Sequence, residues 1–311
     1  MHVFVTGASG WVGRGLVPDL LGAGHTVTGL ARSESSADAV RAAGAPVRSG
    51  SLDDLDGLRA AAQEADGVVH LAFKHDIAFS GDYAGASAAD RAAIEAFGEA
   101  LAGTGKPFVI ASGILGVLGL APGVVATERD GLAGDRSGPI SGGGGRIANA
   151  TSTLALAERG VRSSVVRLPP ATHGDGDNGF LPTAIRFARE KGAVAYVGEG
   201  LNRWPSVHRD DAARVFRLAL ESAPAGTVLH AVGEEGVAIR GVAEVLAAHL
   251  GIPAVSVAPD DAREYLGWLG GFWGVDGPAS AAITRDLLGW EPSRPGLLAD
   301  LDLSHYWASD R

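Results

Sequence analysis

The sequence predicts an α/β protein built on a doubly wound parallel sheet, with a smaller, mixed C-terminal domain. An apolar run from Val3 to Val5 leads into a turn with several glycines and then into a helical pattern. Strand-like and helical segments alternate through the first half of the chain, and this alternation stops after Leu168. Because parallel strands need crossover connections, repeated alternation implies a parallel sheet with helices on both faces.

The alternation gives the expected elements in order. The first strand should begin at residue 2, and further strands are expected at 25–31, 46–49, 67–72, 106–111 and 163–168. Helices are expected between them at 11–23, 36–43, 55–64, 88–102 and 147–159. Residues 113–145 are rich in Gly and Pro, and a segment of that length inside a compact domain is typically functional or mobile.

Beyond Leu168 the expected elements are mixed. Helical patterns cover residues 178–190, 210–222, 239–250, 262–269 and 279–288, and extended ones cover 194–197 and 227–232. We therefore predict two domains. The first combines residues 1–168 with 208–232, and the second combines 169–207 with 233–311.

The composition argues against several classes of function. The chain has 311 residues, of which 46% are hydrophobic, so a sizeable core is expected. A net charge of −10 without a basic run argues against nucleic acid or an anionic membrane surface as a partner. The absence of cysteine excludes disulfides and thiol catalysis, and the histidines lack metal-ligand spacing. No apolar stretch could cross a bilayer and no signal peptide is expected, so we predict a cytoplasmic protein.

The glycine turn predicts a dinucleotide site. Gly7 allows a tight turn, Gly10 removes a side chain where phosphates approach, and Gly13 lets the helix pack on the strand. The free N–H groups at the start of the helix would then face the pyrophosphate. The site we predict here also includes Ser9, Trp11 and Val12. The alternative is an ordinary turn in a chain with 46 glycines.

These residues carry a family resemblance. Thr6–Gly13 resembles the glycine signature of the extended short-chain dehydrogenase/reductases, the NAD(P)-dependent epimerase/dehydratase group, which has a Rossmann fold. Four further stretches resemble segments of that family, in the same order along the chain: Ser51–Asp53, His70–Ala72, Val207–Ala213 and Leu288–Pro292. The resemblance covers nearly the whole chain.

The resemblance implies a set of cofactor contacts. In the family, the segment after the third strand meets the adenine, the fourth-strand segment lines the cofactor, and the backbone after the sixth strand reaches the nicotinamide. The residues at these places are Leu52, Asp53, Leu71, Ala72, Phe73, Lys74, Pro169 and Thr172. An alternative role for Asp53 is to cap the helix that follows it.

The catalytic signature of the family is missing. The resemblance implies a Ser or Thr after the fifth strand and a Y-x-x-x-K pair on the next long helix. No tyrosine lies between Tyr83 and Tyr196, and the helix entrance instead begins Gly145-Arg146-Ile147. The family's Ser/Thr position aligns with Ile114, while Ser112 remains nearby as both a cofactor contact and a catalytic candidate.

The end of the second strand favours NADP(H) over NAD(H). Sites specific for NAD place an acidic residue there to bond the ribose 2′-hydroxyl, and this stretch has no carboxylate before Glu34. Arg32 can instead pair with a 2′-phosphate, with Ser33 donating beside it. The alternative is a solvated surface arginine.

Without the tyrosine, the sequence favours reduction of a C=N bond or an activated C=C bond. Ketone reduction needs a proton donor for the forming alkoxide, whereas an iminium or a conjugated acceptor relaxes that need. A carbonyl reductase with a relocated acid is the first alternative, with His173, Tyr196 and, less favoured, His208 as candidates and Asp90 as a water anchor or helix cap. A non-catalytic NADP-sensing module is the second.

The irregular C-terminal part should bind a small-molecule substrate. The residues that we assign to substrate binding are Phe180, Tyr196, Arg203, Trp204, Trp268 and Phe272. Their aromatic side chains favour a bulky apolar substrate, although the same residues could form core or a dimer contact. By analogy with the family, the Ala-rich helices at 88–102 and 147–156 predict a homodimer.

Overall fold

The computed structural model describes residues 1–114, 123–131 and 144–307, and it contains a seven-stranded sheet in which every pairing is parallel. The strand order is β10-β6-β5-β4-β1-β2-β3. Their bounds are β1 His2–Thr6, β2 Thr26–Ala31, β3 Val47–Ser49, β4 Gly67–His70, β5 Pro107–Gly113, β6 Arg162–Leu168 and β10 Thr227–His230. The predicted fold class is confirmed. The order reverses between β1 and β4, which is where an open α/β sheet offers a ligand crevice.

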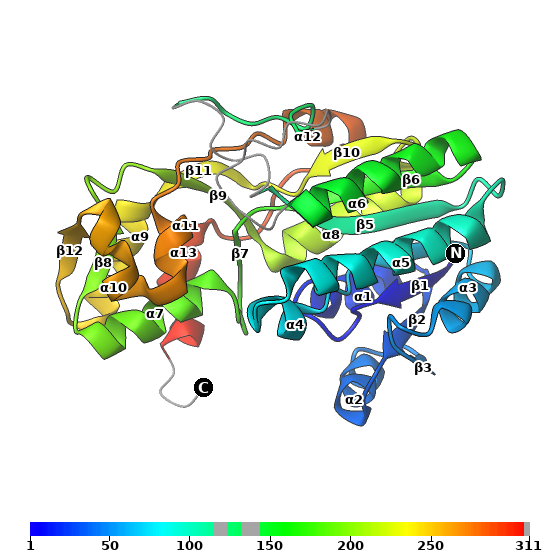
Figure 1. Cartoon of the computed structure of the whole chain (residues 1–311), viewed down its shortest axis with the longest axis horizontal. Helices are drawn as coiled ribbons and strands as arrows, with labels where there is room; N and C mark the ends of the chain where they lie inside the picture. Colours follow the sequence, from blue (N-terminus) through cyan, green and yellow to red (C-terminus); the bar gives the residue numbers. More distant parts are fainter. Residues whose placement is uncertain (115–122, 132–143, 308–311) are drawn as a thin grey trace.

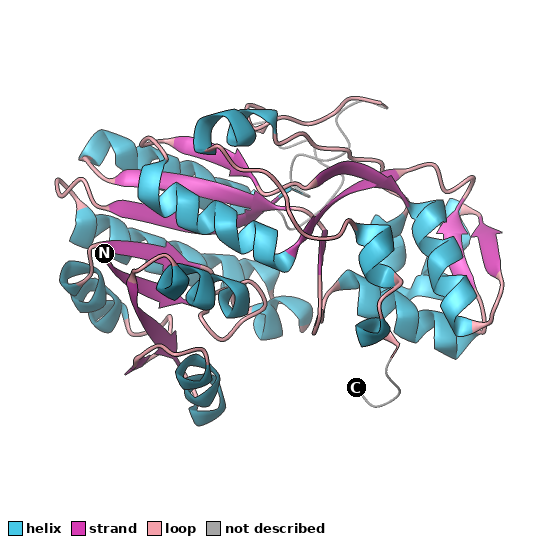
Figure 2. Cartoon of the chain, turned by 180° about the vertical axis from the view of Figure 1, so that it is seen from behind, coloured by secondary structure: helices cyan, strands magenta, loops and turns pink. Residues whose placement is uncertain are grey.

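Helices cover both faces of this large sheet (Figures 1 and 2). Their bounds are α1 Gly13–Gly22, α2 Glu34–Ala42, α3 Leu55–Glu64, α4 His75–Phe79, α5 Tyr83–Leu101, α6 Gly144–Ala155, a 3₁₀ turn Leu156–Arg159, α8 Arg209–Ser222 and α12 Ala282–Leu288. Alternate residues of β1 explain the two layers. Val3 and Val5 point into one core with α1 and α8, while Phe4 points into the other with α3 and α5.

A smaller unit lies beyond the carboxyl edge of the large sheet (Figure 1). It holds a three-stranded sheet in the order β11-β9-β7 and a two-stranded sheet of β12 and β8. The strands are β7 Ala171–His173, β8 Val194–Val197, β9 Arg203–His208, β11 Glu234–Ala238 and β12 Ala254–Val257. The helices are α7 Phe180–Lys191, α9 Ile239–Leu250, α10 Ala262–Leu266, α11 Gly270–Trp273 and α13 Leu297–Leu301, with 3₁₀ turns at Pro259–Asp261, Gly267–Leu269 and Ser304–Tyr306.

Residues 279–294 return to the large sheet before the chain enters α13 of the smaller unit. Leu288 and Trp290 are buried in the core that α1 and α8 share. The Trp290 indole N–H donates to the Asp211 backbone oxygen at 3.1 Å, and the Asp211 carboxylate accepts from the N–H groups of Ser293 at 2.9 Å and Arg294 at 2.8 Å. Residues 279–294 therefore pack with the large sheet, whereas the sequence assigned all of 233–311 to the second domain.

The sequence also leads to expectations about a second copy of the chain and about a membrane. Helices α5 and α6 lie side by side on one face of the large sheet (Figure 1), and the homodimer through them stays a prediction. Within the described part of the chain, no helix combines the length and apolar character that a membrane crossing requires.

Asp211 should be the principal residue that holds residues 290–294 against α8. Because its buried carboxylate serves two backbone N–H groups, Asp211→Ala leaves both donors unsatisfied and should lower the free energy of unfolding by about 3–5 kcal/mol. Urea unfolding at pH 7 measures this. Asp286→Ala, at an exposed position of α12, is the control and should change the same quantity by less than about 0.5 kcal/mol. Equal effects of the two substitutions would contradict the anchoring role.

Candidate functional site

The glycine turn joins β1 to α1 at the carboxyl edge of the large sheet. Gly7 has φ +69°, and a Cβ there would lie 2.8 Å from the Ala72 backbone nitrogen. A Cβ on Gly13 would overlap the Gly7 backbone oxygen, so α1 can approach β1 only with glycine at this position. Both contacts are with backbone, which cannot move aside as a flexible side chain would.

The residues of the turn suit a pyrophosphate. Gly10 is exposed, its N–H donates to the Gly7 oxygen at 2.9 Å, and the nearest atom to a Cβ built on it is that same oxygen at 3.1 Å. The first turn of α1 carries no acidic residue, so its free N–H groups favour an anion. The missing side chain at Gly10 and the free N–H groups of α1 therefore suit the phosphates of a dinucleotide.

Two ion pairs cross the edge on the β2 and β3 side. Arg32 donates to the Asp76 carboxylate at 3.2 Å, and Lys74 donates to Asp53 at 2.6 and 2.8 Å. The predicted cap is corrected, because Asp54 and not Asp53 accepts the helix N–H, from Gly57 at 3.0 Å.

Ser33 has a local partner at the start of α2. Its hydroxyl accepts from the Ser36 N–H, and the Ser36 hydroxyl accepts in turn from the Ser33 N–H at 3.0 Å, which makes a reciprocal cap. Arg32, the residue before it, has a side chain that is 62% exposed and within reach of solvent. The arginine and the capped helix start lie together at the end of β2. Leu52, which the sequence placed at the adenine, is buried in the α3–α5 core.

A buried chain of hydrogen bonds lies beneath the turn. The Thr6 hydroxyl lies 2.6 Å from His70 Nδ1, and His70 Nε2 lies 3.1 Å from the Asp90 carboxylate. The Asn149 amide donates to Asp90 at 2.7 Å and to the Ser87 backbone oxygen at 2.9 Å. Burial opposes ionisation of Asp90, but the hydrogen bonds from His70 and Asn149 and the nearby charge of Arg146 hold its pKa below the ordinary value. Asp90 lies inside α5 and is therefore not a helix cap, because Asp82 caps α5; its role as a water anchor stays a prediction.

Three side chains gather where β4 and β5 end. Arg146, in the first turn of α6, donates to the Ala111 backbone oxygen at 2.7 Å, and its guanidinium carbon lies 4.4 Å from the Phe73 ring centre. The ring of Tyr83, at the start of α5, lies 5.8 Å from the same Phe73 ring. Burial raises the Tyr83 pKa, and the nearby charge of Arg146 opposes that shift. Neither Arg146 nor Tyr83 was predicted from the sequence as a site residue.

The predicted serine lies at this same edge. Ser112 is the next-to-last residue of β5, with 7% of its surface exposed. Ile114, at the position aligned with the family's Ser or Thr, is completely buried in the core that α1 and α8 share. Beyond Ile114 the described chain resumes at residue 123, so much of the long 113–145 segment lies outside the described residues.

The segment after β6 meets the glycine turn directly. The Trp11 indole N–H donates to the Thr172 backbone oxygen at 3.0 Å, and the Thr172 hydroxyl donates to the Pro169 oxygen at 3.0 Å. The Arg209 guanidinium carbon lies 4.8 Å from the Trp11 ring centre. The structure therefore brings together the predicted contacts at positions 11, 169 and 172.

His173 lies in the small unit's core. It is completely buried, and its Nδ1 lies 2.9 Å from the Asp300 carboxylate on α13. The His208 ring packs edge-on against the His173 ring, with 5.6 Å between the ring centres. His208 Nδ1 accepts from the Asp210 N–H and so caps α8. Since substrate cannot reach a completely buried ring, this geometry gives His173 a packing role and does not favour the predicted catalytic one.

Asp177 is an unusual acid in the loop after β7. It accepts hydrogen bonds from the Gly179 N–H at 2.7 Å and the Tyr306 hydroxyl at 3.0 Å. Burial nevertheless raises its pKa to about 6, because desolvation of the carboxylate outweighs these two bonds.

The predicted substrate residues divide into two groups. One aromatic cluster consists of Phe180, Trp268 and Phe272. The Phe180 ring centre lies 5.7 Å from that of Trp268 and 6.4 Å from that of Phe272. Trp268 is 46% exposed. Trp204 touches this cluster but is completely enclosed in the core, at 1% exposure.

The other predicted substrate residues lie elsewhere. Arg203 is occupied by a two-pronged contact with Asp276. Tyr196 lies on β8 at the outer end of the small unit (Figure 1), with Arg240 against its ring. That position separates Tyr196 from the glycine turn, so the structure does not favour it as a relocated acid.

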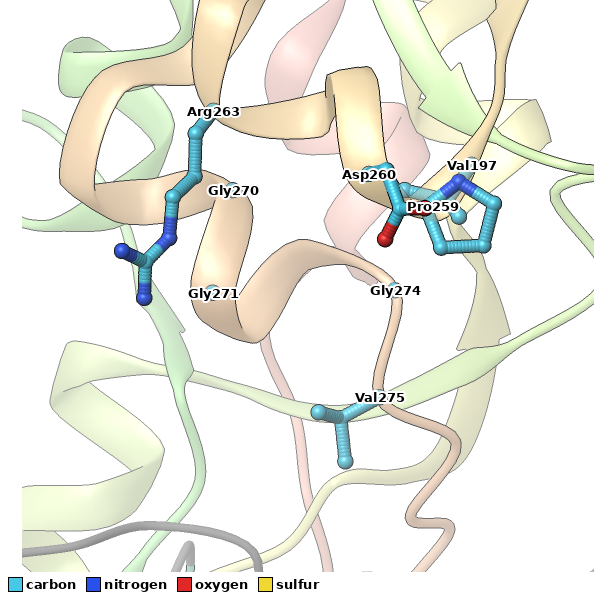
Figure 3. Close-up of a pocket in the computed structure, with 8 residues that line it drawn as sticks. All are labelled: Val197, Pro259, Asp260, Arg263, Gly270, Gly271, Gly274 and Val275. Carbon is cyan, nitrogen blue, oxygen red and sulfur yellow. The ribbon is translucent and has the colours of Figure 1, made fainter.

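One cavity of about 480 Å³ lies within the small unit (Figure 3). Its lining residues are Val197, Pro259, Asp260, Arg263, Gly270, Gly271, Gly274 and Val275. None of them belongs to the glycine turn or to the ends of β4 and β5, so this cavity is separate from the dinucleotide crevice. Among the residues that the structure describes, no group of three His, Asp or Glu is arranged to hold a metal ion.

The raised pKa of Asp177 predicts a pH dependence. Its pKa is about 6 in the folded chain and about 3.9 in the unfolded chain, so its contribution to stability is complete below pH ~4 and is lost as the pH rises through 6. Asp177→Asn cannot ionise and should therefore gain stability over the wild type as the pH rises, by roughly 1–2 kcal/mol between pH 4 and 7. Urea unfolding at both values tests this. Asp286→Asn is the control, and a gain that is the same at pH 4 and pH 7 would contradict the assignment.

Comparisons with known proteins agree with this geometry. The model of the NAD dependent epimerase/dehydratase family matches residues 3–96. An uncharacterised protein of Schizosaccharomyces pombe is 43% identical over 307 residues, which cover 99% of this chain and 100% of the relative. UDP-glucose 4-epimerase from Thermotoga maritima, solved with UDP-glucose, has a TM-score of 0.76 at 20% identity and covers 99% of this chain and 98% of its own. MoeE5, solved with UDP-glucuronic acid and NAD, has a TM-score of 0.73 at 21% identity and covers 97% and 96%.

Proposed function

The chain belongs to the NAD-dependent epimerase/dehydratase family, and from this premise we propose that it is an NADPH-dependent oxidoreductase. We propose that it reduces a C=N bond or an activated C=C bond of a bulky apolar substrate. The observation that carries the proposal is the first turn of α6, where Arg146 stands beside Phe73 and Ala111 in a helix that has neither Tyr nor Lys. A bound nicotinamide dinucleotide supplies the hydride for such a reduction.

Arg32 supports the choice of NADP(H). Its partner Asp76 is an exposed carboxylate after β4, so the guanidinium at the end of β2 already pairs with an anion, as it would pair with a 2′-phosphate. Exposed pairs of this kind are worth only about 0–1 kcal/mol, so a phosphate can replace the carboxylate at little cost. MoeE5 was solved with NAD, so the preference proposed here rests on the residues of this chain.

Arg32→Ala should weaken NADPH binding about tenfold or more and change NADH binding little, because the lost contact involves only the 2′-phosphate. Asp76→Asn should tighten NADPH binding, since it removes the competing carboxylate. Fluorescence titration with NADPH and with NADH measures the two dissociation constants of each variant. Arg41→Ala is the matched control, because Arg41 is an ion-paired arginine on α2. Equal weakening of NADPH and NADH by Arg32→Ala would contradict the assignment.

A carbonyl reductase with a relocated acid is the second candidate, and Tyr83 favours it. The Tyr83 ring shares the Phe73 contact with Arg146, so a phenol lies near the end of β4. A phenol is protonated at neutral pH, as a proton donor requires, although the burial that raises the Tyr83 pKa also makes it a weaker acid. This candidate replaces the His173, Tyr196 and Asp90 roles that the sequence considered.

Substrate panels separate the candidates. Purified protein with NADPH should reduce cyclic imines or conjugated enones at least tenfold faster, by kcat/KM, than matched saturated ketones and aldehydes. Tyr83→Phe should leave those rates within about threefold. Efficient ketone reduction that Tyr83→Phe abolishes would favour the carbonyl reductase. Tight NADPH binding without turnover of any class would favour the NADP-sensing module.

A further inference from the structure

The placement of Arg146 puts a cation at the hydride-accepting end of the crevice. The glycine turn and Arg32 assign the phosphates and the adenosine to β1 and β2, on one side of the point where the strand order reverses. A dinucleotide that crosses this point extends over the carboxyl ends of β4 and β5. Arg146 is held between those two ends by Ala111 on β5 and Phe73 just after β4.

The described partners of Arg146 are a backbone oxygen and an aromatic ring. Within residues 1–114, 123–131 and 144–307, no carboxylate forms an ion pair with Arg146, and its one hydrogen bond goes to a backbone oxygen. Asp90, an acid whose pKa the charge of Arg146 helps to lower, already accepts from His70 and Asn149. A guanidinium has five N–H donors, so most of them remain for a ligand.

We propose that Arg146 binds the oxygen of a conjugated acceptor and makes this protein selective for activated C=C bonds over C=N bonds. The inference rests on the proposed function and narrows its substrate class. A guanidinium stays protonated, so it stabilises negative charge that develops on an oxygen and does not serve as the proton donor. The same fixed charge repels a cationic iminium, which places imines outside the preferred class.

The reduction balances without an acid in the protein. A hydride, which carries two electrons, moves from the reduced dinucleotide to the β-carbon of an α,β-unsaturated carbonyl compound. The C=C electrons shift to form an enolate, whose oxygen accepts hydrogen bonds from Arg146. Water then protonates the α-carbon and leaves as hydroxide, which the solvent neutralises, so the products are the saturated carbonyl compound and the oxidised dinucleotide.

Enone kinetics test the role in turnover. Arg146→Gln should lower kcat for 2-cyclohexenone about 100-fold, the usual loss for one oxyanion donor, while the Kd for NADPH changes less than threefold. Guanidinium chloride at millimolar concentration should restore part of the rate to Arg146→Ala, which a merely structural role would not allow. Arg186→Gln is the matched control, because Arg186 also lies over a ring, Phe187, at 4.3 Å, but on α7 of the small unit.

A binding assay tests the same residue without turnover. 4-Nitrophenol carries delocalised charge on oxygen as an enolate does, and its absorbance reports its ionisation. The wild type with NADP⁺ should bind the phenolate at least tenfold more tightly than Arg146→Gln does, with no such difference for Arg186→Gln. Equal phenolate binding, or faster imine reduction by the wild type than by Arg146→Gln, would overturn the inference. If the wild type reduces nothing but this charge preference holds, the proposed function fails while the anion site stands.

Discussion

The contact between Thr6 and His70 fixes the carboxyl ends of β1 and β4 to each other, and the candidate site depends on it. The Thr6 hydroxyl lies 2.6 Å from His70 and accepts from the Ala72 N–H at 3.3 Å, directly beside Gly7. Since Gly7 has no room for a Cβ against Ala72, the glycine turn and the end of β4 form one unit. The row of buried hydrogen bonds continues from His70 through Asp90 to Asn149 on α6. Arg146 stands one turn before Asn149, so the same buried bonds set the position of the cation.

The ion pairs over the crevice are more exposed to solvent than the hydrogen bonds beneath it. Arg32–Asp76 and Lys74–Asp53 both connect the β2 and β3 side to the segment after β4. Asp76 and Asp53 are more than half exposed, so each pair adds little to stability and can exchange partners. The crevice thus combines a rigid base, which fixes the turn, with exchangeable charges where a dinucleotide has to enter. This difference follows from burial, because buried polar groups need complete hydrogen bonding and exposed ones do not.

Periodicity predicted the large sheet, since buried parallel strands read as apolar runs between amphipathic helices. It failed for β9, where Pro205 and polar residues conceal a strand that β7 and β11 define by pairing on both sides. The glycine turn was readable because its geometry requires glycine. The roles of His173 and Asp90 were not, because their partners Asp300 and Asn149 lie 127 and 59 residues away. Arg146 was visible at a helix start, but its importance depends on Phe73 and Ala111, which no local pattern connects to it.

The buried hydrogen bonds that link Thr6, His70, Asp90 and Asn149 argue for electrostatic rather than proton-transfer chemistry at this site. If His70 carries its proton on Nε2, it donates to Asp90 and accepts from the Thr6 hydroxyl. The Asn149 amide gives its two protons to Asp90 and Ser87. Every donor in this row of hydrogen bonds is then used within it, and none is left to pass a proton toward the crevice. A site arranged in this way stabilises charge through the fixed cation of Arg146 and leaves protonation to solvent, which suits an acceptor whose enolate is stable enough to wait for water.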